Sequence, residues 1–432
     1  METIEILILV LSFLSLLALG VPISFSIGIA SLATMLFSIK AVPSFTTISQ
    51  RMATGIDSFA LLAIPFFILA GQLMNSGGIA RRLIDFAKVL VGKLPGGLAF
   101  VNIMAAMLFG AISGSAAAAA SAIGGFMTPV MRKEGYDRGF SAAVNISSST
   151  TGLIIPPSNI LIVYSLASGG VSIAALFLAG YLPGILMGLS LMVVAFVYAK
   201  KHNYRTTITF TFGDAFKKFL DAIPSLLLVI IVIGGIIAGY FTATEASAIA
   251  VLYAFILSVF IYKEVKFNDL HKILLSSATT TGIIMLLIGT SMAMSWVMAY
   301  ENIPQNVAAS LIALSNDKFV ILIIINLILL FVGTFMDMTP AVLIFTPIFL
   351  PVAVNVGIDP IHFGIIMVMN LCIGLCTPPV GSILFVGCSV AELSITKVIK
   401  PLIPMFIAML FALLITTYFP ELSLWVPKLF GF

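Results

Sequence analysis

Two apolar stretches, one in each half of the chain, are interrupted by the same pattern of glycine and proline. Residues 152–157 read Gly-Leu-Ile-Ile-Pro-Pro, and residues 374–379, which lie 222 positions later (378 minus 156), read Gly-Leu-Cys-Thr-Pro-Pro. The same offset aligns further positions: Pro129 with Pro351, Gly135 with Gly357, Asp137 with Asp359, and Ser172 with Ser394. An offset kept across so many turn-forming residues indicates an internal repeat. In each copy a helix breaks inside apolar sequence, where a break needs a physical reason.

The composition restricts the surroundings in which this chain can fold. Of its 432 residues, 61% are hydrophobic and 9% are charged, whereas a soluble domain carries about 25% charged residues. Apolar runs occupy about 4–39, 58–75, 98–130, 140–168, 171–199, 223–241, 243–262, 273–299, 319–353, 361–390 and 398–420. Runs of this length predict α-helices that cross a bilayer. A β-barrel is excluded because the runs do not alternate between apolar and polar residues. We therefore predict an all-α polytopic membrane protein.

The basic residues predict which loops share one side of the membrane. Of the 21 Lys and Arg residues, 17 lie in five loops: 76–97, 131–139, 200–222, 263–272 and 391–400. The positive-inside rule places these loops in the cytoplasm. Loops 300–318 and 354–360 hold almost no positive charge, so they are predicted to be external.

This charge pattern gives segments 98–130 and 319–353 both of their ends on one side of the membrane. Each is therefore predicted to be a re-entrant helical hairpin, with Ser113-Gly114-Ser115 near the tip of the first and Asp337 near the tip of the second. The hairpins enter from opposite sides, and such an inverted-topology repeat is the architecture of secondary transporters. The alternative is two unrelated helix pairs with coincidental prolines. It is disfavoured because the repeat spacing and the charge pattern are independent and agree.

Four regions are expected along the chain. They are 1–97, N-terminal scaffold helices with a basic amphipathic arm at 79–93; 98–199, the first repeat, with its hairpin, broken helix and following helix; 200–318, a linker at 200–222 and a second scaffold region; and 319–432, the second repeat. All four belong to one membrane unit, because neither hairpin can bury its polar tip alone.

Each interruption frees backbone oxygen atoms inside apolar surroundings. Proline has no N–H group, so Pro156 and Pro378 leave upstream carbonyl groups without partners, and Gly152 and Gly374 permit an unwound backbone. Hydroxyl oxygens accompany these carbonyls, from Ser113, Ser115, Ser158, Thr334, Thr339 and Thr377. Such a group of neutral oxygens suits a hard cation, and we predict Na⁺. The helices that start beyond the breaks present N–H dipoles, which suit a carboxylate.

Asp337 is the single residue that points most strongly to a functional site, because most other acids lie at segment ends or in loops. A carboxylate at membrane depth costs about 2.5–3.5 kcal/mol on insertion scales. Neither Lys nor Arg lies at comparable depth, so a bound cation is its predicted partner; the alternative is a helix cap inside the hairpin turn. Glu245 fits a first-turn acid in an N-terminal cap. Asn145 and Asn159 either line the cavity or form hydrogen bonds between helices.

Several motifs together resemble the large membrane subunit of the tripartite ATP-independent periplasmic (TRAP) transporters, the DctM-like or SiaM-like family. They are Asp57–Phe67, Leu73–Gly78, Ser113–Ala116, Ile155–Ser158, Phe241–Glu245 and Leu375–Pro379. The resemblance implies a Na⁺-driven transporter of the elevator type in the bacterial inner membrane. It also implies two partners, a small four-helix membrane subunit and a periplasmic substrate-binding protein. The implied substrates are organic acids: C4-dicarboxylates, sialic acid or other sugar acids.

The resemblance also implies the site residues. Sodium sites carry over to Ser113 and Ser115 with the break at Gly152, Ile155 and Pro156, and to Thr334 and Asp337 with the break at Gly374 and Thr377. The substrate site between them would use Ser115, Ser158, Asn159, Asp337 and Pro379. Two departures leave the substrate open. The family often has an acid where this chain has Ala116–Ala120, and sialic-acid members can carry a basic residue in place of Tyr300.

Two other classes of function compete with this reading. One is a stand-alone ion-coupled carboxylate carrier of the same architecture without a binding protein. The other is a membrane-embedded enzyme or a channel. An enzyme would show an intramembrane Ser/Lys pair, a His/Glu metal cluster or paired acids, and the sequence shows none. We therefore predict no catalytic residue, no cofactor and no metal other than Na⁺.

Overall fold

The computed structural model describes residues 2–204, 211–315 and 317–432, and within these ranges it contains helices and no β-strand. The first half comprises α1 (Glu2–Ala18), α2 (Ile23–Ser38), α3 (Ala41–Ile56), the 3₁₀ segment η1 (Phe59–Leu62), α4 (Ala63–Ser76), α5 (Ile79–Val91), α6 (Gly97–Ser113), α7 (Ala116–Lys133), α8 (Arg138–Thr151), α9 (Asn159–Ala167) and α10 (Ile173–Lys201). The second half comprises α11 (Phe212–Ile237), α12 (Ala243–Phe255), the π segment η2 (Ile256–Ile261), α13 (Phe267–Tyr300), α14 (Ile303–Leu314), α15 (Lys318–Phe335), α16 (Met338–Asn355), α17 (Pro360–Gly374), α18 (Ser382–Ala391), α19 (Ile395–Tyr418) and α20 (Glu421–Leu429). Eight of the described helical segments are long and apolar enough to cross a membrane.

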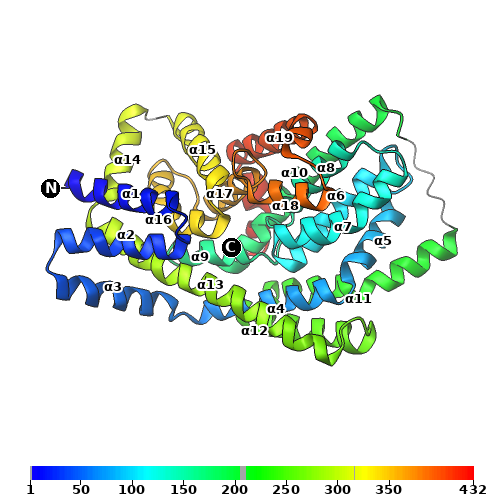
Figure 1. Ribbon diagram of the computed structural model, residues 1–432, viewed down its shortest axis with the longest axis horizontal. Helices are drawn as coiled ribbons and strands as arrows, with labels where there is room; N and C mark the ends of the chain where they lie inside the picture. Colours follow the sequence, from blue (N-terminus) through cyan, green and yellow to red (C-terminus); the bar gives the residue numbers. More distant parts are fainter. Residues whose placement is uncertain (1, 205–210, 316) are drawn as a thin grey trace.

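The repeat seen in the sequence is a repeat of helices. Adding 222 to the bounds of α7 gives those of α16, and the starts of α8 and α10 fall on the starts of α17 and α19. Each copy is a helical hairpin, a helix broken into two pieces, and a long helix (Figure 1). The contacts between the copies are reciprocal, because α7 packs on α18 and α16 packs on α9. Such reciprocity is what two units related by a pseudo-two-fold axis produce.

The five basic loops meet on one face of the molecule. Four contacts join them: Arg82 Nη2 to Glu264 Oε1 (4.0 Å), Lys218 Nζ to Asp85 Oδ1 (3.4 Å), the Asp137 N–H to Tyr204 Oη (3.0 Å), and Arg138 Nη2 to the Ala391 carbonyl (3.0 Å). The loops therefore share one side, as the charge pattern predicts. That this side is the cytoplasm stays a prediction.

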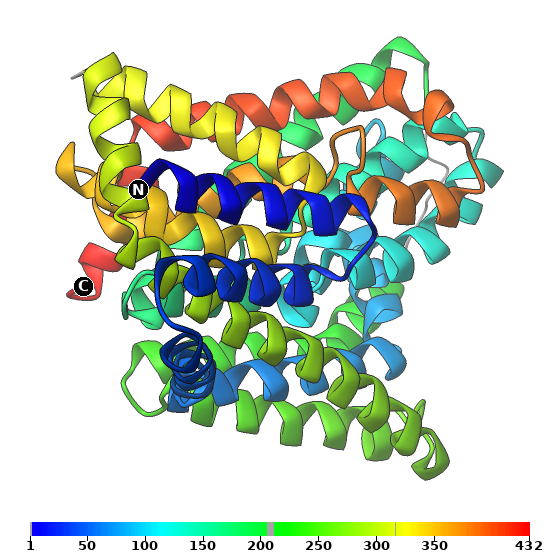
Figure 2. The ribbon, with the colours of Figure 1, turned by 60° about the vertical axis from the view of Figure 1, so that its left-hand side comes forward.

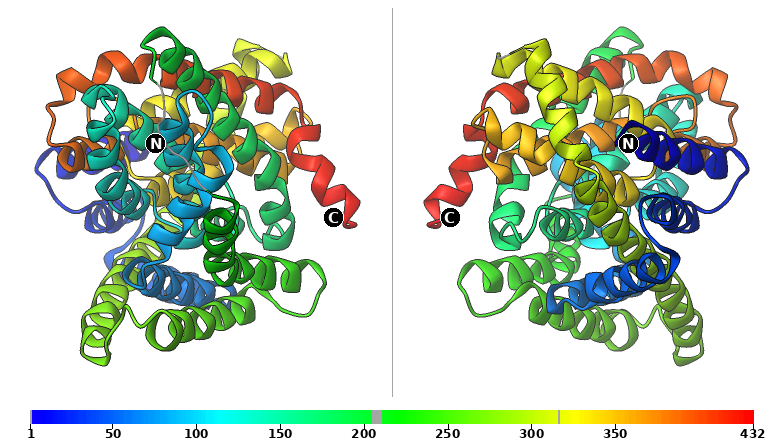
Figure 3. Two further views of the ribbon diagram at one scale, coloured as in Figure 1. Left: turned by 90° about the vertical axis from the view of Figure 1, so that its right-hand side faces the viewer. Right: turned by 90° about the vertical axis from the view of Figure 1, so that its left-hand side faces the viewer.

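A second set of contacts gathers the chain at the opposite end of the long helices. They are Ser38 Oγ to Glu301 Oε1 (2.6 Å), Tyr164 Oη to the Pro360 carbonyl (2.6 Å), Tyr418 Oη to the Phe319 carbonyl (3.1 Å), and His362 Nδ1 with Ser423 Oγ (2.5 Å). Hairpin α15–α16 starts and ends at this face, whereas hairpin α6–α7 starts and ends at the basic face. Figure 3 views the molecule along the longest axis of Figure 1, and α20, next to the C-terminus, projects from one side.

The remaining helices surround the two repeats. Helix α4 packs on α12 and α13, and α2 packs on α13. Helix α5 is the basic amphipathic segment predicted at 79–93, and it packs on α6 and α11. Helices α1 and α2 lie antiparallel (Figure 2). The apolar run at 4–39 is therefore a pair of helices turned back at Gly20, whose φ is +79°.

The apolar runs of the sequence missed two helices, and they gave a third helix, α11, the wrong starting residue. The segment between the apolar runs 4–39 and 58–75 forms α3, and the predicted loop 300–318 contains α14. Both are short and carry polar side chains along one face, so neither gives a continuous apolar run. Within the predicted linker 200–222, α10 extends to Lys201 and α11 begins at Phe212, and residues 205–210 lie outside the described part of the chain.

Paired glycines hold each hairpin against its broken helix. A Cβ atom on Gly152 would lie 2.5 Å from Gly110 Cα, and one on Gly374 would lie 2.5 Å from Gly333 Cα. These distances are too short for any side chain, so the backbones touch directly at equivalent points of the two copies. The hairpin tip and the helix break of each copy are thereby fixed side by side.

Replacing Gly374 with Ala should push hairpin α15–α16 away from α17. Overpacking of this kind costs about 1–3 kcal/mol, so we expect a lower apparent melting temperature for the detergent-purified protein. Gly234→Ala in α11 is the matched control, since a Cβ on that helical glycine meets nothing within 4 Å. Equal melting temperatures for the two variants would contradict the glycine contact.

Candidate functional site

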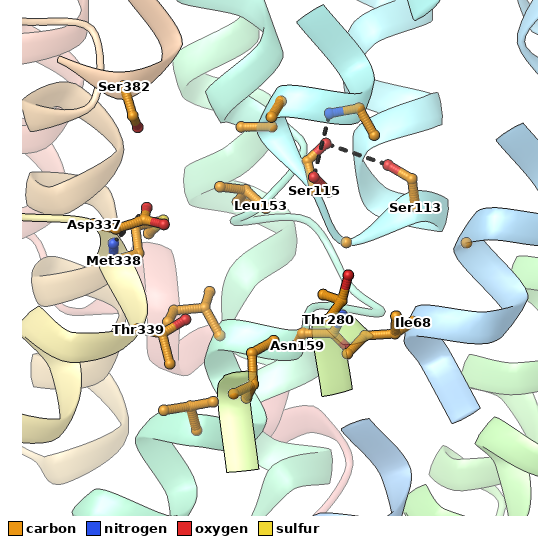
Figure 4. Close-up of a pocket in the computed structure, with 18 of the residues that line it drawn as sticks. Ile68, Ser113, Ser115, Leu153, Asn159, Thr280, Asp337, Met338, Thr339 and Ser382 are labelled. Atoms are coloured by element: carbon orange, nitrogen blue, oxygen red, sulfur yellow. Dashed lines mark hydrogen bonds between the residues drawn. The ribbon is translucent and has the colours of Figure 1, made fainter. Parts of the chain in front are cut away.

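A cavity of about 480 Å³ lies where the two hairpin tips face each other. Residues 113–118 of the first hairpin and 337–340 of the second both line it, and α4 and α13 close a further side. Figure 4 shows Asp337 and Thr339 across the cavity from Ser113 and Ser115, with Asn159 and Thr280 below Ser115 in this view. The tips that the sequence placed in separate halves thus share one space.

Four helices begin at this cavity. The first-turn residues of α7, α9, α16 and α18 all contribute to its wall. The N-terminus of a helix carries about half a positive charge on its unpaired N–H groups. None of the described lining residues is Lys or Arg, so the helix N-termini are the positive groups that these residues present to the cavity. A carboxylate is the ligand that such an arrangement favours.

The first tip is shaped by a hydroxyl cap and a glycine. Ser115 Oγ accepts a hydrogen bond from the Ala118 N–H at 3.2 Å and so caps α7, and Ser113 Oγ donates to the Ser115 carbonyl at 3.4 Å. Gly114 has φ +62°, and a Cβ there would lie 2.7 Å from Asn159 Nδ2. The turn therefore needs glycine for its backbone and for the close approach of Asn159.

Asp337 occupies the equivalent position in the second tip, 222 residues after Ser115. Its Oδ1 accepts a hydrogen bond from the Met338 N–H at 2.9 Å, so it caps α16 as the alternative reading proposed. The side chain remains exposed at the cavity, and no ion pair to it forms within the described residues. Capping uses part of one carboxylate oxygen and leaves the rest free for a ligand.

Most residues of the first break lie behind the cavity wall. Gly152, Pro156 and Ser158 are buried, and Ile155 is half-buried and packs beside Gly184 of α10. The Ser158 hydroxyl donates to the Leu153 carbonyl at 2.5 Å. One of the carbonyls that the diproline leaves without an N–H partner is therefore satisfied by this chain, and Ser158 does not line the cavity.

The second break is tied directly to its hairpin tip. The Gly381 N–H donates to the Thr334 carbonyl at 3.1 Å, and the Ile383 N–H donates to the Leu375 carbonyl at 3.1 Å. The Thr334 hydroxyl donates to the Phe331 carbonyl and the Thr377 hydroxyl donates to the Ile373 carbonyl, both at 2.7 Å. Gly374 is buried against Gly333, while Pro379 is exposed. Of the predicted site residues, Ser113, Ser115, Asn159 and Asp337 line the cavity itself.

Four polar lining residues were not predicted. Gln72 and Asn75 lie one helical turn apart on α4, Thr280 lies on α13, and Ser382 begins α18. The sequence does carry a signal for Gln72 and Asn75, because two amides at positions i and i+3 of an apolar segment share one helix face. Gln72 and Asn75 lie in a scaffold segment, outside the two repeats.

The structure also shows which of the two predicted roles is filled by Glu245, Asn145 and Asn159. Glu245 completes a capping box with Thr242 at the start of α12, which confirms the structural reading. Asn145 Nδ2 donates to the Ala120 carbonyl at 2.9 Å and joins two helices. Asn159 lines the cavity instead.

Comparison with known proteins places this arrangement in a family. The profile of the tripartite ATP-independent periplasmic transporter, DctM component, matches residues 10–422. Protein YgiK of Salmonella typhimurium is 58% identical over 99% of this chain and 98% of its own. The C4-dicarboxylate TRAP transporter large permease protein DctM of Rhodobacter capsulatus is 38% identical over 97% and 98% of the two chains. The sialic acid TRAP transporter large permease protein SiaM of Vibrio cholerae is also 38% identical, over 98% of each.

A solved structure shares the fold at low sequence identity. The YdaH transporter of Alcanivorax borkumensis superposes with a TM-score of 0.65 at 13% identity, covering 90% of this chain and 88% of that one. Its similarity supports an all-helical polytopic membrane fold. The profile match and the relatives lead to one conclusion: the chain belongs to the DctM family of TRAP transporter large permease proteins.

Proposed function

We propose that this protein is the large membrane subunit of a Na⁺-coupled TRAP transporter that imports an organic acid across the bacterial inner membrane. A periplasmic binding protein would deliver the acid, and a small four-helix membrane subunit would complete the membrane complex. The observation that carries the proposal is the convergence on a single cavity of four helix N-termini and the Asp337 carboxylate, which forms no ion pair within the described residues.

The acid and the two Na⁺ ions would occupy different positions at and beside this cavity. The N–H groups that begin α7, α9, α16 and α18 suit a carboxylate. Asp337 has no cationic side chain beside it among the described residues, which makes a cation its natural partner. We assign one Na⁺ position to Thr334, Asp337 and the second break, and another to Ser113, Ser115 and the first break. Carbonyl and hydroxyl oxygens of the kind found there are ligands that hard cations prefer.

Coupling follows if Na⁺ organises the tips that contact the acid. A ligand shifts a conformational equilibrium only by its differential affinity for the two states. An ion held between a hairpin tip and its helix break would favour the geometry in which the neighbouring N–H groups face the acid. Binding of the acid and of Na⁺ would then each strengthen the other.

Transport requires the loaded cavity to reach both sides of the membrane. We propose an elevator movement in which the repeats at 98–199 and 319–432 travel together against the scaffold regions 1–97 and 200–318. The two hairpins would be re-entrant and approach from opposite leaflets. Reciprocal packing of α7 on α18 and of α16 on α9 favours one rigid unit, since it joins the two repeats to each other.

One substitution can remove the negative charge of Asp337 while keeping its role as a helix cap. Asn caps a helix as well as Asp does, so Asp337→Asn should keep the fold but lower Na⁺-driven uptake into proteoliposomes by more than about tenfold. That loss corresponds to one charge-assisted contact of about 1.5–3 kcal/mol. Asp359→Asn is the matched control, because Asp359 caps α17 through the Ile361 N–H (2.8 Å) without lining the cavity. Uptake by Asp337→Asn that equals the control, or wild-type uptake that persists with K⁺ in place of Na⁺, would refute the coupling.

Dependence on the two partners is a separate prediction. Proteoliposomes that hold this chain and the small subunit should accumulate the acid only when the loaded binding protein is added outside. Vesicles without the binding protein serve as the control. Uptake of free acid in those vesicles would instead support a stand-alone carrier.

A further inference from the structure

We infer that Gly71 of α4 is a positioning residue. Its missing side chain forms a notch that receives the tip of the first hairpin and so sets where the moving repeats stop against the scaffold. The inference rests on the proposed function, because it adds a defined stopping position to the proposed elevator movement. It comes from one close backbone contact between α4 and the end of α6.

This contact joins a scaffold helix to a hairpin tip through backbone atoms. A Cβ atom on Gly71 would lie 2.7 Å from the Ser113 carbonyl oxygen and 3.2 Å from Ser113 Cα. Both residues are buried, and both line the cavity. Figure 4 shows Ser113 between Ser115 and the ribbon of α4 in this view. Backbone atoms cannot rotate aside as a flexible side chain can, so any side chain at position 71 would push the tip away from α4.

Gly71 differs from other glycines of the scaffold helices in what it touches. Gly28 lies against the side chain of Thr290, and Gly55 lies against the side chain of Met292. Both of these contacts join scaffold helices to each other. The contact of Gly71 instead joins the scaffold to a repeat, at an interface that the proposed movement would have to break.

The notch occurs at one position along the face of α4 that lines the cavity. Residues 64, 68, 71 and 75 recur at the spacing of one helix face, and all four line the cavity. Three of them, Ile64, Ile68 and Asn75, carry side chains. One helical turn rises about 5.4 Å, so a shift of the tip by one turn along α4 would bring Ser113 against a side chain. The tip can therefore approach the α4 backbone this closely in one register.

The second hairpin has no equivalent notch among the described residues. Its counterpart of Ser113, 222 positions later, is Phe335, whose side chain is 49% exposed. Helix α16 packs on α13 and α14. In α13, however, a Cβ on Gly282 would meet nothing within 4 Å and Gly289 lies against α3, while α14 contains no glycine. A backbone stop of this kind therefore acts on the first hairpin.

Electron paramagnetic resonance distances between two spin labels test this inference on the full chain in proteoliposomes. The labels are attached at Asn268→Cys, near the start of α13, and at Lys133→Cys, at the end of α7. Both positions are exposed and lie outside the cavity. The three native cysteines are buried, so the introduced thiols are the ones that react. We expect one narrow distance component for the docked repeats and a second component for the displaced repeats.

Gly71→Ala should shift the ratio of the two components away from the docked one by at least about fivefold. Overpacking against a backbone corresponds to about 5–150-fold in an equilibrium constant. Gly282→Ala is the matched control, because both substitutions gain the same helix propensity but a Cβ on Gly282 meets nothing. A purely structural defect would lower the yield of folded protein and leave the ratio unchanged.

The outcomes separate this inference from the proposed function. An unchanged ratio in folded Gly71→Ala, or an equal shift in Gly282→Ala, would overturn the role of Gly71. If Gly71→Ala does not fold, the labelled protein with Gly71 intact still tests the notch, since a broad and continuous docked component would contradict a single register. A single component that is identical in Na⁺ and in K⁺ would instead count against the elevator movement itself.

Discussion

The backbone at the two hairpin turns and the two helix breaks needs partners that lipid cannot supply. In a chain with 9% charged residues, few charged side chains are present to form hydrogen bonds with this backbone. The structure meets the need mainly with its own backbone and small hydroxyls. In the first break the Ser158 hydroxyl donates to the Leu153 carbonyl, and in the second the Ile383 N–H donates to the equivalent Leu375 carbonyl. The first turns of α7, α9, α16 and α18 line the cavity, where solvent, an ion or a substrate can reach their N–H groups.

Close backbone contact makes this arrangement possible. At Gly110 with Gly152, and at Gly333 with Gly374, two backbones meet where no side chain fits. Each hairpin tip is thereby held at a fixed distance from a helix break in its own copy. The reciprocal packing of α7 on α18 and α16 on α9 then brings both pairs to one cavity. Glycine contacts position the tips, and the helix N-termini around the space between them suit an anion.

Much of this could be predicted from the sequence, because the deciding residues interrupt an apolar background. The 222-residue offset, the hairpin tips and the gathering of the five basic loops all follow from Gly, Pro, Lys and Arg positions. Helices α3 and α14 were missed because their mixed polar faces give no apolar run. Gln72, Asn75 and Thr280 were missed for another reason: the repeat pattern marks the two copies, while the scaffold side of the cavity depends on how α4 and α13 pack against them.

The two copies share a backbone but differ in charge. Ser115 and Asp337 cap equivalent helices at equivalent positions, and each faces the cavity. A hydroxyl cap satisfies the helix without adding charge, whereas a carboxylate cap also attracts a cation. A symmetric scaffold with two hydroxyl caps would treat its two tips alike, so binding of an ion would not distinguish one tip from the other. With a carboxylate at Asp337 and a hydroxyl at Ser115, the Na⁺ of the proposed mechanism would act more strongly on hairpin α15–α16 than on hairpin α6–α7, so the two hairpins would respond differently to the same ion.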